Sequence, residues 1–155
     1  MILAPRRQLC EWHAVSVTNP MVGDDYARAC AVSDYLGSIS VGGGLALVLG
    51  DTPDSTTVIA SDLGPALVRW GFADSEADIL EAVHEHLPTA EMLEEMVYHA
   101  EEPSHVLFDS VFAGNEFEDS LELLLEVGIY RILTRRHIGP KAEFLAHVFE
   151  QVPKP

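Results

Sequence analysis

The side chains that could do chemistry are few in this sequence, and the first to consider are three consecutive glycines. Gly42, Gly43 and Gly44 could form a loop that cradles a phosphate. A phosphate-binding P-loop also needs a Lys-Ser/Thr pair and a following helix, whereas an apolar run at 45–49 follows here. Because glycine tolerates positive φ, the spacing favours a hairpin turn over a phosphate site.

The histidines and aspartates do not form a recognisable reactive group either. His84 and His86 are two residues apart on an expected helix, so their side chains point in different directions. A metal site needs three or four converging ligands. Asp51 and Asp54 flank an expected turn, where carboxylates usually cap backbone amides. We therefore expect no catalytic residue, no metal and no cofactor, and predict that the chain is not an enzyme.

The two cysteines, Cys10 and Cys30, form no C-x-x-C pair. We expect both to be reduced thiols in a reducing compartment, with Cys30 buried. No apolar run approaches the ~18 residues of a membrane span, and the N-terminus lacks the apolar region of a signal peptide. The prediction is a cytoplasmic protein that does not bind membranes.

Length and periodicity predict one α+β domain spanning residues 1–155, with 48% hydrophobic residues to form its core. Apolar patterns predict strands at 1–4, 37–41, 45–49, 56–60, 66–72, 106–108, 121–125, 129–134 and 144–149. Helical spacing at 75–87 and again at 89–97 predicts a helix pair, with Pro88 between the two helices. We expect a mostly antiparallel sheet of about six to seven strands, with this helix pair between an N-terminal and a C-terminal block of strands.

The distribution of charge is the most informative feature of the sequence. The net charge is −16, from 9 basic and 25 acidic residues. Between Arg69 and Arg131 there is no lysine or arginine, and 16 of the 25 acids lie there. Nucleic acid and anionic membranes are therefore poor partners, and a basic protein is a better one. Any ion pairs that relieve the repulsion within this segment must come from basic residues outside it.

Two interpretations of this acidic segment stay open. It could be a solvated surface that keeps the protein soluble, or a docking face for a cationic macromolecule. The predicted partner-binding residues are Glu91, Glu94, Glu95, Glu101, Glu102, Glu116, Glu118 and Asp119.

Longer stretches of the chain resemble a known family. The run from Asp24 to Pro53, DDYARACAVSDYLGSISVGGGLALVLGDTP, is similar to the immunity protein 21 family, as is LVRWGFADSEADIL at 67–80. The resemblance resumes in VLFDSVFAGNEF and GIYRILTRR. It implies a protein of bacterial polymorphic toxin systems that binds a cognate toxin domain and neutralises it by protein–protein interaction, without catalysis. That toxin domain is expected to be basic.

Two other functions are compatible with the sequence. A small-ligand or regulatory α+β binding domain would need a concave apolar pocket with a few polar groups. An acidic mimic of nucleic acid would need carboxylates spaced like phosphates along one face. The sequence leaves the oligomeric state open.

Overall fold

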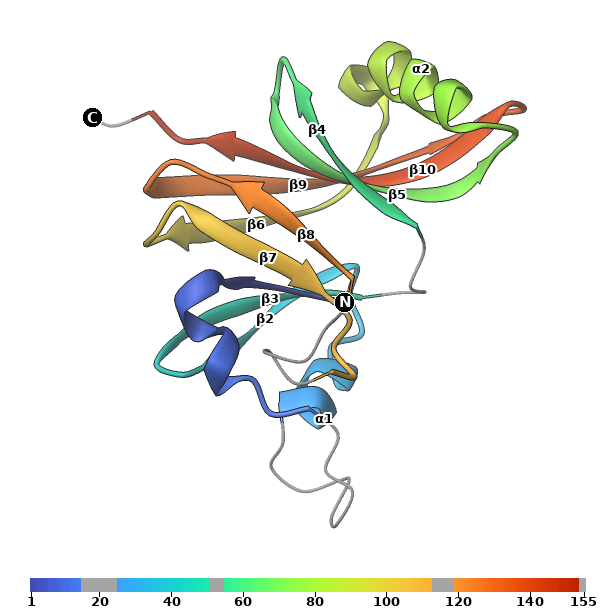
Figure 1. Ribbon diagram of the computed structural model, residues 1–155. Helices are drawn as coiled ribbons and strands as arrows, with labels where there is room; N and C mark the ends of the chain where they lie inside the picture. Colours follow the sequence, from blue (N-terminus) through green and yellow to red (C-terminus); the bar gives the residue numbers. More distant parts are fainter. Residues whose placement is uncertain (15–24, 51–54, 113–118, 154–155) are drawn as a thin grey trace. The chain divides into compact units, whose positions relative to one another are not determined.

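The computed structural model describes residues 1–14, 25–50, 55–112 and 119–153 (Figure 1). The chain forms two compact units, each assembled from two separate stretches of sequence. The first unit comprises residues 1–52 and 102–126, and the second comprises 53–101 and 127–155. The prediction of a single domain stays a prediction.

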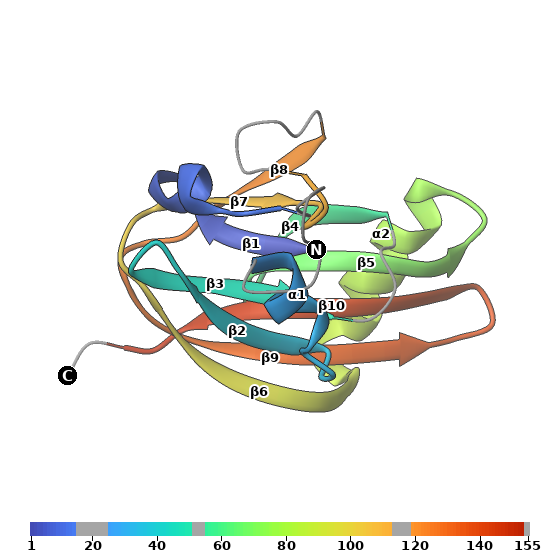
Figure 2. The ribbon, with the colours of Figure 1, turned by 90° about the horizontal axis from the view of Figure 1, so that it is seen from below.

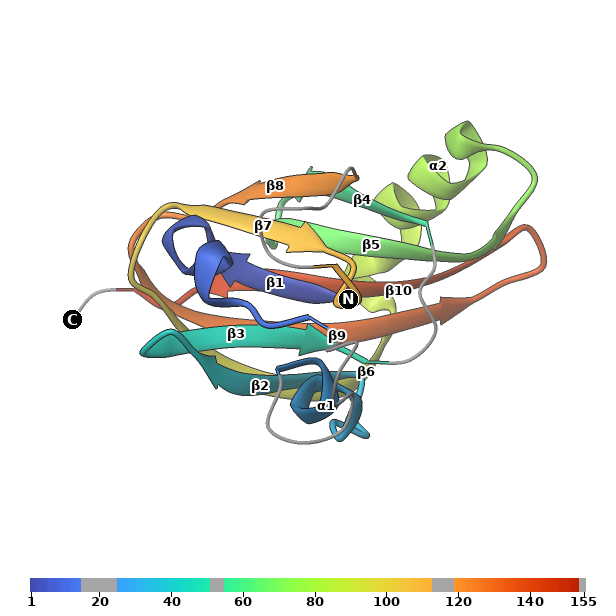
Figure 3. The same cartoon turned by 60° about the horizontal axis from the view of Figure 1, so that its bottom comes forward.

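The first unit is built on a five-stranded sheet whose strand order is β2-β3-β1-β7-β8, with every neighbouring pair antiparallel. Figure 3 shows these strands side by side in this order. The strands are β1 (Ile2–Pro5), β2 (Leu36–Val41), β3 (Gly44–Leu49), β7 (Ser104–Phe108) and β8 (Ser120–Leu124).

Two short helices, η1 (Arg6–Glu11, a 3-10 helix) and α1 (Asp25–Cys30), pack on this sheet. Trp12, which follows η1, makes an edge-to-face contact with Phe108 of β7, with ring centroids 5.7 Å apart. Ala29 of α1 joins the same buried cluster, whereas Cys30 and Cys10 are both exposed. The prediction that Cys30 is buried is therefore wrong, because Ala29 is the residue of that turn that packs inward.

The β2–β3 hairpin confirms the interpretation of the glycine run. Val41 pairs with Gly44, so Gly42 and Gly43 form a two-residue turn with φ of 53° and 82°. Positive φ at both central positions is the geometry that matches the twist of hairpin strands, and glycine adopts it without steric cost.

The second unit contains a second five-stranded antiparallel sheet, in the order β4-β5-β10-β9-β6. Figure 2 shows β6 at its outer edge beside β9. The strands are β4 (Thr56–Ser61), β5 (Gly64–Ala73), β6 (Glu91–Ala100), β9 (Gly128–Ile138) and β10 (Ala142–Gln151).

The helix α2 (Glu76–His86) and the 3-10 turn η2 (Leu87–Thr89) pack on one face of this second sheet (Figure 1). Ser75 caps α2, since its hydroxyl oxygen accepts a 3.2 Å hydrogen bond from the Asp78 amide. Ile79 and Val83 of α2 are buried against Ala146 and Val148 of β10. The helix predicted at 75–87 is therefore confirmed.

The α+β class and the mostly antiparallel pairing are confirmed, but two features of the predicted fold are wrong. The described residues form two sheets of five strands instead of one of six to seven, and the second helix predicted at 89–97 is the strand β6. A register shift between Met92 and Glu94 marks a β-bulge there. The extra residue breaks the two-residue alternation, so the apolar side chains acquire a spacing typical of a helix.

None of the helices in the described ranges combines the length and the apolar composition that crossing a membrane requires.

Candidate functional site

The predicted partner-binding residues are divided between the two units. The second unit holds Glu91, Glu94, Glu95 and Glu101, and the first unit holds Glu102 and Asp119. Glu116 and Glu118 lie outside the described residues.

Strand β6 also separates neighbouring carboxylates. Glu94 pairs with Thr134 and Glu95 with Leu133, which are adjacent positions on β9 and therefore lie on opposite faces of the sheet. A helix would have placed Glu91, Glu94 and Glu95 on one side. The structure therefore does not bring all the β6 carboxylates together on one face.

On the face that carries α2, Glu95 belongs to a network with two residues of the closing strands. The Arg131 guanidinium donates two hydrogen bonds to Glu95, from Nε to Oε1 at 2.9 Å and from Nη2 to Oε2 at 3.0 Å. Its Nη1 lies 3.6 Å from Oε2 of Glu150 on β10. The hydrogen bond from Arg131 lowers the pKa of Glu95, and the same contact raises the pKa of Arg131. Such two-point contacts fix the geometry of the pair, although exposure to solvent keeps their energy small.

On the opposite face, the carboxylates of β6 contact other residues of β9. Arg136 Nη2 lies 3.4 Å from Oε2 of Glu91. Thr134 Oγ1 lies 3.5 Å from Oε1 of Glu94 and 3.1 Å from Nδ1 of the buried His147.

In the first unit, Glu102 and Glu122 fasten the start of η1. The Arg7 amide donates a 3.1 Å hydrogen bond to Glu102 Oε1, so the carboxylate satisfies a backbone donor of the first helical turn. Glu122 Oε1 accepts hydrogen bonds from Ser104 Oγ at 2.6 Å and from Arg6 Nη2 at 3.1 Å. These contacts, with Ser104 contributing most, lower the pKa of Glu122.

The arginines that pair with these acids confirm the expectation that the compensating positive charge comes from outside the acidic segment. Arg6, Arg7, Arg131 and Arg136 all lie outside the acidic segment in sequence, yet each forms an ion pair with a carboxylate from within it. Part of the segment's charge is therefore compensated inside each unit.

The acids of α2 and Asp74, two residues before the helix, are arranged differently. No ion pair with lysine or arginine involves them in the part of the chain that the structure describes. These residues are Asp74, Glu76, Asp78, Glu81 and Glu85. Glu85 lies 3.7 Å from the ring of His86. This helix surface keeps its negative charge.

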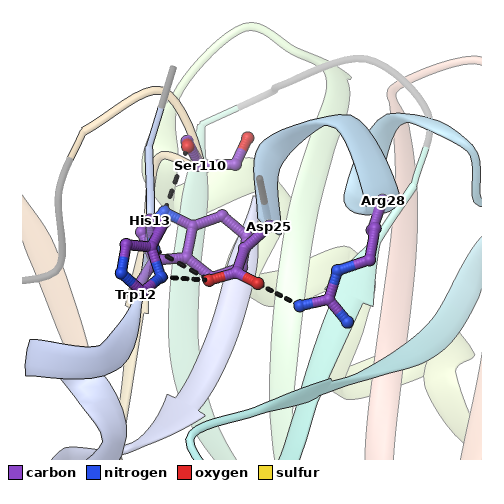
Figure 4. Close-up of polar contacts among 5 residues, drawn as sticks. All are labelled: Trp12, His13, Asp25, Arg28 and Ser110. Atoms are coloured by element: carbon purple, nitrogen blue, oxygen red, sulfur yellow. Dashed lines mark hydrogen bonds and ion pairs between the residues drawn. The ribbon is translucent and has the colours of Figure 1, made fainter. Parts of the chain in front are cut away.

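A buried polar group at the start of α1 has a structural role (Figure 4). Asp25 is almost fully buried and accepts a 2.8 Å hydrogen bond from the His13 amide, while Arg28 forms an ion pair with its other oxygen. Trp12 Nε1 donates a 3.2 Å hydrogen bond to the Ser110 carbonyl. These contacts tie α1 and the chain after β7 to the end of η1.

The described part of the second unit contains hollows, of which two concern α2. One, of about 430 Å³, is lined by acids of α2 together with His86, His137 and Lys141. The other, of about 660 Å³, is mainly apolar and lies between β4 and α2, lined by Ile59, Leu63, Leu80, Val83, Leu87 and others. Leu80 of α2 lines this groove and is 40% exposed. Sequence reasoning missed the groove, because helical spacing shows which apolar residues share one side of a helix. It does not show which of them the neighbouring sheet leaves uncovered.

The histidines give no sign of a reactive centre. Within the described ranges, no three His, Cys, Asp or Glu side chains are grouped so that they could hold a metal ion. Burial lowers the pKa of His105, and burial together with the Arg69 charge lowers the pKa of His147 to about 3. Both side chains are inside the fold and away from the two hollows.

Comparison with known proteins gives one result. The family model described as Immunity protein 21 matches residues 1–142, which is most of the chain. A search of curated proteins and a search of solved structures each found no match.

Proposed function

We propose that this chain, which belongs to the immunity protein 21 family, binds a cognate toxin domain and neutralises it by protein–protein contact. The family match over residues 1–142 is the observation that carries this proposal. The mechanism is occlusion of the toxin's active site, and it requires no chemistry from the immunity protein.

The charge of the chain supports a basic toxin as the partner. Ion pairs inside each unit rearrange charge locally, but they leave the net charge at −16. A field of this sign attracts and orients a cationic protein, and the effect appears chiefly in the association rate. Salt screens such a field, since the Debye length falls to about 8 Å at physiological ionic strength.

The predicted partner-binding residues support this role through their charge. Glu95 and Glu102 each form an ion pair with an arginine of their own chain, and Glu101 and Asp119 are exposed at the surface. We propose that Glu101 and Asp119 contribute to the field that attracts the toxin domain.

A growth assay tests the function itself. The C-terminal toxin domain encoded beside this gene is expressed with and without this chain in the same cells. Rescue of growth by this chain, but not by an unrelated acidic protein of similar size, is the expected result. Continued toxicity with a folded, well-expressed chain, together with no capture of the purified toxin domain, would exclude the function.

A pair of variants tests the electrostatic part. Glu101→Gln combined with Asp119→Asn is compared with Glu11→Gln combined with Asp34→Asn, which removes the same total charge from exposed positions elsewhere. At low salt, the first double variant should associate with the toxin domain more slowly than the second. Equal rates would mean that only the total charge matters and that neither predicted residue steers the encounter.

The nucleic-acid mimic has less support. Arg131 stands beside Glu95 on one face of the sheet, and Arg136 stands beside Glu91 on the other. A surface that imitates a row of phosphates would not place guanidinium groups among its carboxylates. The small-ligand alternative has a hollow of suitable size, about 660 Å³, but the family assignment favours a macromolecular partner.

A further inference from the structure

The face of the second sheet that carries α2 is only partly covered by that helix. At one end lies the groove between β4 and α2, and β4 is an edge strand of the sheet. Leu80 of α2 is 40% exposed beside the buried Val83 and Leu87 in this groove. An apolar side chain from another molecule would find apolar atoms on both walls.

The strand register connects this groove to the far edge of the same face. Residues directly opposite each other on antiparallel strands project to the same side. A single row of such pairs crosses the sheet from β4 to β6, namely Ile59, Ala66, Val148, Leu133 and Glu95. The groove and the Glu95 carboxylate therefore belong to one continuous face.

The next row of this face is open to solvent. Val97 of β6 lies opposite Arg131 of β9, which in turn lies opposite Glu150 of β10. Val97 is 69% exposed, and Ile129, two residues before Arg131 on β9, is also exposed. Exposed apolar side chains thus stand beside the network of Glu95, Arg131 and Glu150. We call the groove together with this open row the helix-side face.

We propose that the helix-side face is the surface that holds the toxin domain, by receiving a protruding segment in which an apolar side chain is flanked by lysine or arginine. The inference rests on the proposed function and adds the place and the chemistry of the contact. The apolar anchor enters the groove at Leu80. The cation lies against Glu95 and Glu150, several residues further along an extended segment, because β6 is four strand spacings, or about 19 Å, from β4. Interfaces of this kind draw most of their energy from a few apolar and charged residues at the centre.

Charge complementarity favours a cationic segment of the toxin domain over a second copy of the chain. The residues that line the groove include Asp62 but no lysine or arginine. The network contains two carboxylates and one guanidinium, so it retains a negative charge. A second copy of the chain would bring another −16 to the contact, and like charges at close range oppose association. A cationic segment meets no such opposition.

Two apolar truncations test the face. Leu80→Ser removes the wall of the groove and Val97→Ser removes the most exposed apolar side chain of the open row. Leu45→Ser on β3 of the first unit is the matched control, because Leu45 is 46% exposed and lies outside the helix-side face. The probe is the purified, catalytically inactivated C-terminal toxin domain encoded beside the gene, and its dissociation constant is measured by calorimetry.

We expect Leu80→Ser and Val97→Ser each to weaken binding by about tenfold or more, and Leu45→Ser to change it by less than about twofold. Melting temperatures show whether each variant is folded, and Val97→Ser keeps the test valid if Leu80→Ser unfolds, since its side chain is largely in solvent.

The outcomes separate the two proposals. If the wild-type chain binds the toxin domain and both truncations bind equally well, the helix-side face is refuted and the proposed function stands. If the wild-type chain does not bind, the proposed function fails and the face fails with it. If light scattering shows a dimer of the free chain that Leu80→Ser dissociates, the face is occupied by a second copy and the inference is overturned.

Discussion

His147 gives the most direct test of the structure, because a fully buried histidine makes stability depend on pH. The side chain is inaccessible to solvent, and Thr134 Oγ1 lies 3.1 Å from its Nδ1. Loss of hydration, and secondarily the positive charge of Arg69, lower its pKa to about 3. In the unfolded chain, histidine has a pKa of about 6.5.

The sign and size of the effect follow from proton linkage. Below the unfolded pKa, the unfolded chain binds a proton at this position and the folded chain does not, so stability falls as the pH falls. The contribution of His147 is fully present above about pH 6.5 and is lost as the pH descends towards its folded pKa of about 3. Between about pH 7 and about pH 5 the loss is about 2 kcal/mol.

The measurement is urea unfolding followed by circular dichroism at several pH values. His147→Asn removes the titrating ring while keeping a polar atom near the position of Nδ1, and His99→Asn removes an exposed histidine as the control. The wild type and His99→Asn should lose stability between about pH 7 and about pH 5, and His147→Asn should lose about 2 kcal/mol less. This window lies above the range in which carboxylates such as Glu95 and Glu122 titrate.

Two results would refute the reasoning. One is a pH dependence in His147→Asn equal to that of the wild type. The other is an NMR titration in which the His147 ring of the folded protein gains a proton near pH 6.5, because a ring that protonates there is not buried as described.

Three further predictions concern the elements that build the two units. Ser75→Ala removes the cap of α2 and should cost about 1 kcal/mol of unfolding free energy in urea titrations; an unchanged value would mean that the cap contributes nothing. Gly43→Ala, at a φ of 82° in open space, should destabilise the β2–β3 hairpin by about 1 kcal/mol, and unchanged stability in urea unfolding would contradict the positive φ. Phe144→Ala in the core beneath α2 should cost about 3 to 5 kcal/mol, and a loss below about 1 kcal/mol would contradict its burial.

Much of the fold could be predicted from local patterns. The β2–β3 hairpin and α2 each have a local signal, in the glycine pair and in the Ser75 cap. Strand β6 could not be recognised, because its bulge gives the apolar residues helical spacing and its pairing with β9 depends on residues far away in sequence. Long-range pairing overrode local propensity there. The same applies to the division into two sheets, since each unit combines two stretches that are distant in sequence. Residues 53–101 separate the stretches of the first unit, and residues 102–126 separate those of the second.

The site could be predicted only in part, for a related reason. Composition showed that acids gather between Arg69 and Arg131 and that compensation must come from outside. The strand register determines which of these acids lie close enough to an arginine to form an ion pair. Glu95 meets Arg131 because β6 lies beside β9, and Glu102 meets Arg7 because β7 lies beside β1. No sequence pattern distinguishes these acids from Glu81 or Glu85.

The structure therefore divides the acidic segment into two groups with different physical roles. Carboxylates such as Glu95, Glu102 and Glu122 hold hydrogen bonds within the fold, so their removal should be felt first in stability. Those on α2, including Glu81, have no lysine or arginine ion pair within the described ranges and act mainly through their field. In the proposed complex, the long-range field changes how fast the cationic toxin domain arrives, and the apolar groove beside α2 changes how long it stays. The same helix thus carries the carboxylates of the first effect and, in Leu80, the apolar contact of the second.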